Sequence, residues 1–247
     1  MSSLAAPGSE DYSPENLLDR LSDSRALTHS YLYAMAREQS ILRRRLPISA
    51  GRVLSVGCGW HPGRHLFPAP AFHLVAVDPN GDHVAGVLES GRADEAFVGA
   101  AGALDQLPDR SFDVVLYRLV MHHIAYQGPL LPAFTEAARL LTPGGALVVI
   151  EPGRFHPVGI GLDLANRTGL GPALHGNPDD VPLSPLELAE LARRVRLRPE
   201  LHAVTYSWRR LPVVLQRATT RLDSLGSRPR AALFAHTFML IARPDDR

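Results

Sequence analysis

The sequence contains no lysine, because all 26 of its basic residues are arginine. Without a lysine the chain cannot form a Schiff base or anchor pyridoxal phosphate. It also lacks the lysine that P-loop enzymes and kinases place on a nucleotide phosphate. Arginine does not replace lysine in these roles, since the guanidinium keeps its proton at any working pH and is a poor nucleophile. These classes of chemistry are therefore excluded.

Other features that the sequence lacks exclude further kinds of site and partner. The single cysteine, Cys58, excludes an internal disulfide and a cysteine-rich zinc site, and we expect no metal. A net charge of +1 gives no global field to attract nucleic acid or a membrane surface. Apolar runs such as 146–150 are far shorter than the roughly 18 residues that cross a bilayer, and the N-terminus lacks the pattern of a secretory signal. We therefore expect a single cytoplasmic domain.

The first fifty residues predict a flexible start followed by helices. Residues 1–13 are small, polar and turn-prone. Ser13 and Pro14 have the pattern of a helix N-cap and first turn. Residues 14–50 are apolar at helical spacing and end in the basic cluster 43–45, which suits the C-terminus of a helix. We predict two helices here, forming a cap on the domain.

From residue 52 the hydrophobic pattern changes from helical to extended. Short apolar runs rich in β-branched residues alternate with segments of helical spacing at 81–90 and 130–141. The runs are 52–56, 72–77, 112–117 and 146–150. Strands that are apolar on nearly every residue need helices on both faces of a parallel sheet. The pattern predicts a doubly wound, Rossmann-like α/β fold, with residues 51–152 as its core.

The last hundred residues predict a loop and then the end of the sheet. Residues 153–184 are rich in glycine and proline, which predicts an irregular segment forming a lid or part of a substrate wall. Ser184 followed by Glu187 predicts a capping box for a helix at 185–195. The rest of 185–247 predicts the C-terminal part of the sheet: strand 201–208, helix 212–225 and strand 235–242.

The strongest local motif is the glycine turn VLSVGCG at 53–59, with Asp78 at the end of the next strand. Glycines at such a turn let a ligand approach the backbone, and the acid can accept both hydroxyls of a ribose. The pair predicts a nucleoside site. A dinucleotide site needs a third glycine in Gly-x-Gly-x-x-Gly, but Gly63 comes one residue late, behind His61 and Pro62. S-adenosylmethionine has no phosphate to hold and needs only the first two glycines.

Two further blocks extend the motif: LPDRSFDVVLYRLVMHH at 107–123 and LLTPGGALVVIEP at 140–152. Together with 53–59 and Asp78 they resemble the class I S-adenosylmethionine-dependent methyltransferases, in particular the small-molecule methyltransferases of bacterial secondary metabolism. The resemblance covers about residues 50–152 well and the rest in outline. It implies a seven-stranded sheet whose last strand is antiparallel, S-adenosylmethionine as cofactor and S-adenosylhomocysteine as product.

The resemblance also implies a set of cofactor-binding residues. Gly57, Cys58 and Gly59 would lie along the methionine and ribose of the cofactor. Asp78 would hold the ribose hydroxyls, and Arg118 would offer its backbone carbonyl to the amino group. The remaining members of the implied set are Ser55, Pro79 and Leu104.

The sequence departs from the family pattern at two places. Ser55 stands where the family has an acid, and residues 99–103 contain no acid to meet the adenine amino group, Asp105 being the nearest. These departures motivate an alternative: a protein of the same fold that binds the cofactor but catalyses a non-methylating reaction such as a cyclisation. A nicotinamide oxidoreductase is a third hypothesis.

Three residues that follow the predicted strands 112–117 and 146–150 are candidates for catalysis. His122 and His123 follow the strand 112–117, at the end where ligands of such sheets bind, and a neutral imidazole can act as a base near pH 7. Each has a lining or structural role as its alternative. Glu151 follows the strand 146–150 and could serve as a second base or orient the substrate, unless it is simply paired with Arg154. His156 lies at the same edge.

These observations lead to one predicted function. We expect methyl transfer from S-adenosylmethionine, by in-line displacement, to an oxygen, nitrogen or carbon of a small acceptor. The C-terminal arginines between residues 193 and 230 indicate a solvated face rather than a nucleic-acid surface, since no stacking aromatic recurs among them apart from Trp208. We expect no nucleic acid or membrane partner, and a homodimer is left open.

Overall fold

The computed structural model describes residues 23–171, 182–227 and 229–245. They contain a seven-stranded sheet in the order β3-β2-β1-β4-β5-β7-β6. β7 is antiparallel to both of its neighbours, and the other pairings are parallel. The strands are β1 (Gly51–Val56), β2 (Phe72–Asp78), β3 (Glu95–Val98), β4 (Phe112–Arg118), β5 (Leu141–Pro152), β6 (Leu197–Thr205) and β7 (Thr237–Pro244). The predicted Rossmann-like fold with an antiparallel last strand is confirmed.

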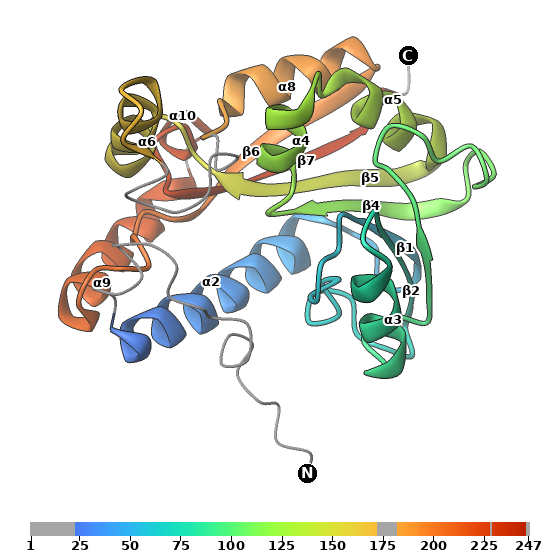
Figure 1. Cartoon of the computed structure of the whole chain (residues 1–247), viewed down its shortest axis with the longest axis horizontal. Coiled ribbons are helices and arrows are strands. Elements are labelled where there is room, and N and C mark those ends of the chain that lie inside the picture. The colour runs from blue at the N-terminus through green and yellow to red at the C-terminus, as the bar shows by residue number, and fades with distance from the viewer. Residues whose placement is uncertain (1–22, 172–181, 228, 246–247) are drawn as a thin grey trace.

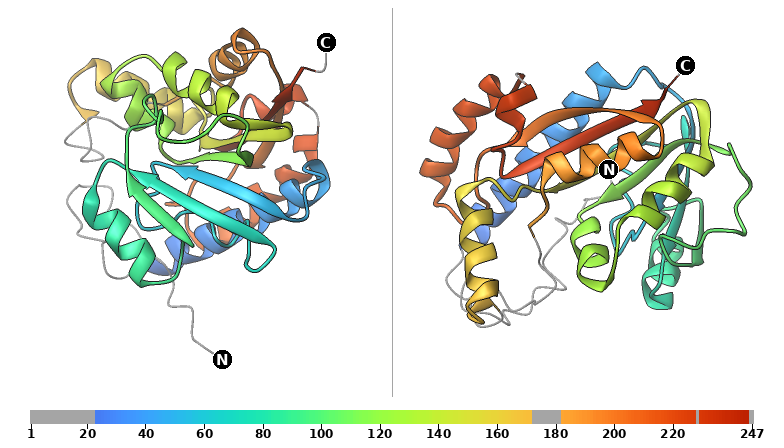
Figure 2. Two further views of the ribbon diagram at one scale, coloured as in Figure 1. Left: turned by 90° about the vertical axis from the view of Figure 1, so that its right-hand side faces the viewer. Right: turned by 90° about the horizontal axis from the view of Figure 1, so that it is seen from above.

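Helices cover both faces of the sheet (Figures 1 and 2). One face is covered by α4 (Met121–Gln127), α5 (Leu131–Leu140) and α8 (Pro185–Arg194), and the other by α2 (Ser24–Arg45) and α3 (Gly81–Glu89). Buried side chains alternate between the two faces. Leu54 packs in the hydrophobic cluster that includes α4, α5 and α8, and Val53 packs in the cluster that includes α2. Because strand side chains alternate in direction, burial of nearly every residue requires both helical layers.

The remaining elements lie at the end of the sheet that contains β6 and β7 (Figure 1). They are α6 (Pro157–Arg167), α9 (Val213–Thr219), the 3-10 helix η1 (Thr220–Ser227) and α10 (Pro229–Ala232). None of the helices in the described part of the chain is long and apolar enough to cross a membrane.

The carboxyl ends of four neighbouring strands come level at one edge of the sheet. Val56 pairs with Val77 on one side and with Tyr117 on the other, and Tyr117 pairs with Val149. Residues that follow these positions therefore lie side by side, with about 4.8 Å between neighbouring strands. The residues brought to this edge are Gly57, Asp78, Arg118 and Glu151.

The connection from β1 to β2, residues 57–71, is described throughout and contains no helix. Arg64 holds it by donating to the carbonyls of Phe67 and Phe72 and by pairing with Asp94 at 2.6 Å. Trp60 packs against α3 at Gly86, where a Cβ atom would lie 2.2 Å from the indole ring. The glycine turn after β1 is therefore not followed by the N-terminus of a helix.

The predicted cap begins the described chain as one long helix. α2 has Asp23 as its N-cap and ends in arginines 43–45, as predicted. The expected flexible start at 1–13, the N-cap at Ser13 and the first of the two predicted helices lie outside the described residues. The capping box is confirmed on its N-cap side, since Ser184 Oγ accepts from the Glu187 N–H at 3.3 Å where α8 begins.

The prediction of an irregular segment over 153–184 is wrong for α6. Pro157 occupies the first turn of this helix, where its missing N–H costs nothing, and the His156 ring caps it by accepting from the Val158 N–H at 3.2 Å. Position 159 inside this helix is a glycine because a Cβ atom there would lie 2.3 Å from the Gly153 carbonyl oxygen. Close packing therefore explains a glycine that indicated a loop in the sequence. Residues 172–181 lie outside the described part.

Other differences concern short elements and boundaries. The sequence did not predict β3 and α4, because each is too short to show a hydrophobic period. β6 begins at Leu197, earlier than predicted, because it continues alongside β7 to Pro244. The single helix predicted at 212–225 is α9 followed by the 3-10 helix η1.

Candidate functional site

The glycine turn after β1 combines close packing with open space. Gly57 and Gly59 both have positive φ angles, 64° and 48°, which favour glycine. A Cβ atom at Gly57 would lie 2.1 Å from Val120 Cγ2 in the turn after β4. At Gly59, by contrast, no heavy atom of the described residues other than its chain neighbours lies within 4 Å of a Cβ position. Gly57 is thus needed for packing, and Gly59 leaves room for a ligand.

Asp78 ends β2 with its carboxylate directed into this turn. Oδ2 accepts from the Gly59 N–H at 2.8 Å, and Oδ1 accepts from the Asn80 N–H at 2.9 Å and from His83 Nδ1 at 3.0 Å. The residue is buried, with 5% of its surface exposed. The sequence predicted the position of Asp78. It did not predict the contact with His83, because that contact depends on which side chains of α3 face the end of β2.

The other implied cofactor residues differ in how much they offer a ligand. Cys58 is buried, and its burial together with the nearby Asp78 carboxylate raises the pKa of the thiol to about 12. Ser55 is buried within β1, and Leu104 has no exposed surface. Pro79 is exposed beside Asp78. Of these residues, Pro79 presents the most side-chain surface at the edge.

Residues 99–103 form a turn after β3, and the structure brings an acid close to it. Ala100 and Ala103 pair across the turn, and the Leu104 N–H donates to Glu136 Oε2 of α5 at 3.2 Å. Glu136 is also bound by Arg139 at 2.8 Å. This arginine holds the pKa of the carboxyl below its usual range. Glu136 thus supports the turn from outside the stretch where the family resemblance placed an acid.

Glu151 and His122 form a buried pair at the ends of β5 and β4. Glu151 Oε1 accepts from the backbone N–H groups of Val120 and Met121, each at 2.7 Å, and Oε2 lies 2.7 Å from His122 Nδ1. Glu151 has no exposed surface. Because a carboxylate can only accept, the proton of this contact lies on Nδ1, and Nε2 is then the basic nitrogen of the neutral ring. The sequence placed both residues at this edge without predicting their contact.

The neighbouring candidates have other partners. The His123 ring lies 4.1 Å from the His122 ring, centroid to centroid. Arg154 pairs with Asp163 at 3.4 Å, so the alternative that it neutralises Glu151 is wrong. His156 caps α6 and its Nε2 lies 3.2 Å from the Tyr206 carbonyl oxygen, so both ring nitrogens serve the fold.

Arg118 directs its guanidinium toward α2. Nε and Nη2 contact the two carboxylate oxygens of Glu38 at 2.9 and 3.3 Å, and His65 Nε2 lies 3.4 Å from Glu38. The guanidinium also lies 5.7 Å from the centre of the Tyr31 ring. Sequence reasoning missed Glu38, although an acid within the apolar stripe of a helix, four residues before Leu42, was a usable signal.

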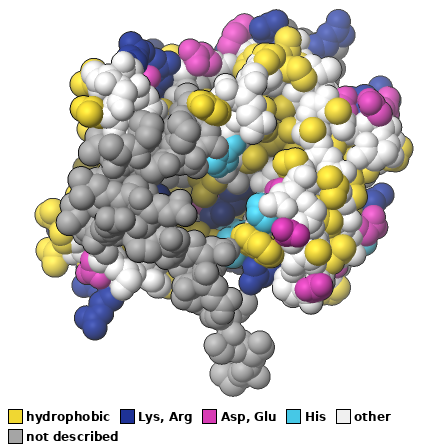
Figure 3. Space-filling view, in the orientation of Figure 1, with side chains coloured by type: hydrophobic (Ala, Val, Ile, Leu, Met, Phe, Trp, Pro, Cys, Tyr) yellow, Lys and Arg dark blue, Asp and Glu magenta, His cyan; other side chains and the backbone are white. Residues whose placement is uncertain are grey.

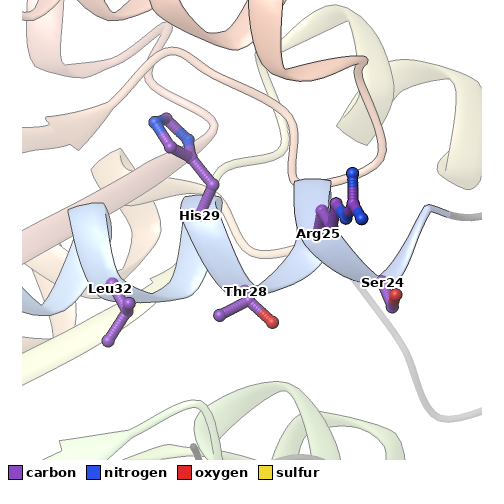
Figure 4. A pocket seen from close by; sticks show the side chains of 5 residues that line it. All are labelled: Ser24, Arg25, Thr28, His29 and Leu32. Carbon is purple, nitrogen blue, oxygen red and sulfur yellow. The ribbon is translucent and has the colours of Figure 1, made fainter.

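The face of the molecule seen in Figure 3 is hollowed near its middle, and histidine side chains gather at the edge of the hollow. A separate cavity of about 350 Å³ opens along the N-terminal half of α2 (Figure 4). Its lining residues are Ser24, Arg25, Thr28, His29 and Leu32. None of them comes from the strand ends that hold Asp78 and Glu151, so we do not assign this cavity to the site.

Comparison with known proteins identifies residues 54–149 as a match to a methyltransferase domain family. No curated protein matches the chain. A S-adenosylmethionine-dependent methyltransferase from Thermotoga maritima, described as a possible histamine N-methyltransferase, has a TM-score of 0.61 and 18% identity over 90% of this chain and 94% of its own.

Two further solved structures share the fold. An S-adenosylmethionine-dependent methyltransferase from Archaeoglobus fulgidus has a TM-score of 0.54 and 18% identity, over 87% of this chain and 99% of its own. Phosphoethanolamine N-methyltransferase 2 of Haemonchus contortus, solved with S-adenosylmethionine, has a TM-score of 0.57 and 18% identity, over 85% of this chain and 53% of its own. Residues 54–149 therefore match a methyltransferase domain family, and the chain has the fold of these S-adenosylmethionine-dependent methyltransferases.

Proposed function

We propose that the protein transfers a methyl group from S-adenosylmethionine to an oxygen, nitrogen or carbon of a small acceptor, with His122 as the base. The observation that carries this proposal is the Glu151–His122 pair at the same sheet edge as the glycine turn and Asp78. A nucleoside site and a positioned base thus lie on neighbouring strands. The finer expectation, an acceptor from secondary metabolism, rests on the sequence resemblance alone.

The residues at the edge fit S-adenosylmethionine better than a dinucleotide. Gly59 leaves open space over the backbone, and the buried Asp78 carboxylate lies beside it. A pyrophosphate would need the N-terminus of a helix after the glycine turn, and residues 57–71 form none. This argues against the nicotinamide hypothesis. Gly57, Gly59 and Asp78 would hold the cofactor, with Pro79 and the Arg118 carbonyl beside them.

When bound, the cofactor supplies a methyl group that is already activated on its sulfonium. The chain then has to hold the acceptor in line with that methyl, at a distance of about 3 to 3.5 Å, and exclude water. Glu151 fixes the His122 ring through Nδ1, so that Nε2 can take the proton from an acceptor hydroxyl or ammonium. The two backbone N–H groups that donate to Glu151 Oε1 hold this carboxylate in position.

Segments next to this edge complete the proposed site. We assign the described residues of 153–184, including α6, to the wall or lid of the acceptor pocket, together with α2 of the predicted N-terminal cap. The similar structures support a small acceptor, since the names of two of them refer to histamine and to phosphoethanolamine. The cytoplasmic location and a homodimer remain predictions.

The test is methyl transfer from labelled S-adenosylmethionine to a panel of hydroxyl, amine and carbon acceptors. His122→Asn should lower kcat and remove the loss of rate at acid pH that protonation of the base causes in the wild type. Glu151→Gln should lower kcat with little change in the affinity for S-adenosylhomocysteine. His73→Ala, at the opposite end of β2, is the matched control. A full rate in both His122→Asn and Glu151→Gln would refute the assigned base.

The alternative is a non-methylating reaction such as a cyclisation on the same fold. It is favoured by the lack of an acid at position 55 and within 99–103, and by the pairing of Glu136, which contacts the turn at Leu104, with Arg139. Binding of S-adenosylhomocysteine without label transfer to any acceptor would support it. A thermal shift with NAD rather than with S-adenosylhomocysteine would support the nicotinamide hypothesis instead.

A further inference from the structure

His83 occupies part of the carboxylate that the proposed function assigns to the cofactor's ribose. A carboxylate has about four lone-pair sites, two on each oxygen. On Asp78 Oδ1, both are used, by the Asn80 N–H and by His83 Nδ1. Oδ2 accepts from the Gly59 N–H and keeps one site. Two neighbouring ribose hydroxyls need two sites, so one of the three present donors has to give way.

His83 is the donor that can move. The Asn80 N–H belongs to the N-cap of α3, and the Gly59 N–H belongs to the glycine turn, so both are fixed by backbone structure. The His83 side chain is 28% exposed, against 7% for Asp78. A ring rotation about two side-chain bonds is enough to release it from the carboxylate.

The surroundings of His83 hold its ring over Asp78 in the absence of a ligand. The Trp60 ring meets it edge on, at 5.1 Å between centroids. Trp60 is itself fixed, because its ring rests on Gly86 and its carbonyl oxygen accepts from Arg92 at 2.9 Å. The indole therefore limits the movement of the His83 ring on one side.

We infer that His83 is a specificity-determining residue that is exchanged on Asp78 for one ribose hydroxyl when a nucleoside binds. A nucleoside with both hydroxyls has to displace the ring, whereas one with a single hydroxyl can use the open site on Oδ2. His83 thus lowers the affinity for the diol and leaves the affinity for the deoxy ligand unchanged. This inference rests on the proposed function, because it needs a nucleoside at Asp78.

The experiment measures the Kd of methylthioadenosine and of its 2′-deoxy analogue by calorimetry. His83→Phe keeps a ring against Trp60 but has no N–H, and His83→Ala is a second variant in case the larger ring disturbs folding. Each should bind methylthioadenosine about tenfold more tightly than the wild type, the effect of one charge-assisted hydrogen bond on an equilibrium constant, with the deoxy analogue unchanged within about twofold. His73→Ala, another partly exposed histidine paired with a carboxylate, should change neither value.

Other results would overturn the exchange. If His83 had a purely structural role, its replacement would change the Kd of both ligands equally. If His83 oriented Asp78, its replacement would weaken the binding of methylthioadenosine. Either result, or an unchanged Kd for methylthioadenosine, refutes the inference while leaving nucleoside binding intact. If no variant and no wild-type protein binds methylthioadenosine or S-adenosylhomocysteine, the proposed function fails and the inference fails with it.

Discussion

The ion pair between Glu38 of α2 and Arg118 of β4 should be one of the most costly side-chain interactions to break. Its two contacts, at 2.9 and 3.3 Å, join the guanidinium to both carboxylate oxygens, and the side chains are only 2% and 7% exposed. Glu38→Ala leaves a buried guanidinium without its counter-charge. The expected cost is about 3–5 kcal/mol. At about 2–4 °C per kcal/mol for a domain of this size, Tm should fall by roughly 6–20 °C.

A double-mutant cycle followed by urea unfolding checks this figure. Arg118→Met should also destabilise, because it leaves the buried Glu38 carboxylate without its guanidinium partner and with His65 alone beside it. The double variant Glu38→Ala/Arg118→Met should cost clearly less than the sum of the two single changes, since neither buried charge remains. The exposed pair of Arg52 and Glu95, at 3.9 Å, provides the control, and Glu95→Ala should cost less than about 1 kcal/mol. Additive single changes, or a Glu38→Ala cost no larger than that of the control, would refute the reasoning.

The same pair predicts a dependence of stability on pH. Burial alone would raise the pKa of Glu38, but the Arg118 guanidinium and His65 outweigh it and hold the pKa below its usual range. The unfolded chain therefore takes up this proton first as the pH falls. Glu38 stabilises the fold fully above its unfolded pKa of about 4.3, and the contribution is lost as the pH falls through the lowered folded value. Glu38→Gln should flatten the unfolding free energy below about pH 4; an unchanged slope would contradict the assignment.

Three further predictions concern Asp78, the glycine turn and the half-buried His236. S-adenosylhomocysteine at 100 times its Kd should stabilise the wild type by about 2.7 kcal/mol, and Asp78→Ala should abolish this thermal shift; an undiminished shift would rule out the ribose assignment. Gly57→Ala should lower the urea midpoint more than Gly59→Ala, because both backbones are left-handed but only the Cβ at 57 meets Val120; equal midpoints would contradict this contact. Burial, with nearby positive groups, lowers the pKa of His236 to about 3, so stability should fall as the pH drops from about 6.5 toward 3, and parallel pH curves for the wild type and His236→Phe would disprove it.

Most of the sheet could be predicted from the sequence because its strands are buried on both faces. Runs such as 52–56 and 112–117 are apolar on nearly every residue, and such runs have few other interpretations once helices lie between them. The beginning of β5 could not be found in the same way. Its first residues, LTPGG, have turn chemistry, and only the pairing of Leu141 with Phe112 extends the strand back to them. A strand boundary that depends on pairing with a neighbouring strand cannot be predicted from the residues of that strand alone.

The candidate site was predictable in position but not in its contacts. The ends of β4 and β5 pointed to His122 and Glu151 separately, and the register that joins them exists only in the assembled sheet. The contact of His83 with Asp78 depends on which face of α3 meets β2. Glu38 comes from a helix far away in the sequence. Charged side chains on helices are usually solvated, whereas the buried Arg118 makes Glu38 part of the interior.

The place of β7 between β5 and β6 has a consequence for how the chain is made. β7 is the only sheet neighbour of β6 among the described strands, and it also pairs with β5 along Leu147 to Pro152. During synthesis, β6 therefore leaves the ribosome before any strand that can pair with it. The glycine turn and the strand ends around it can form earlier, but the sheet closes only when residues up to Pro244 have emerged. A nascent chain that stalls before β7 would expose the unpaired edges of β5 and β6, so completion of the sheet depends on the insertion of its last strand between them.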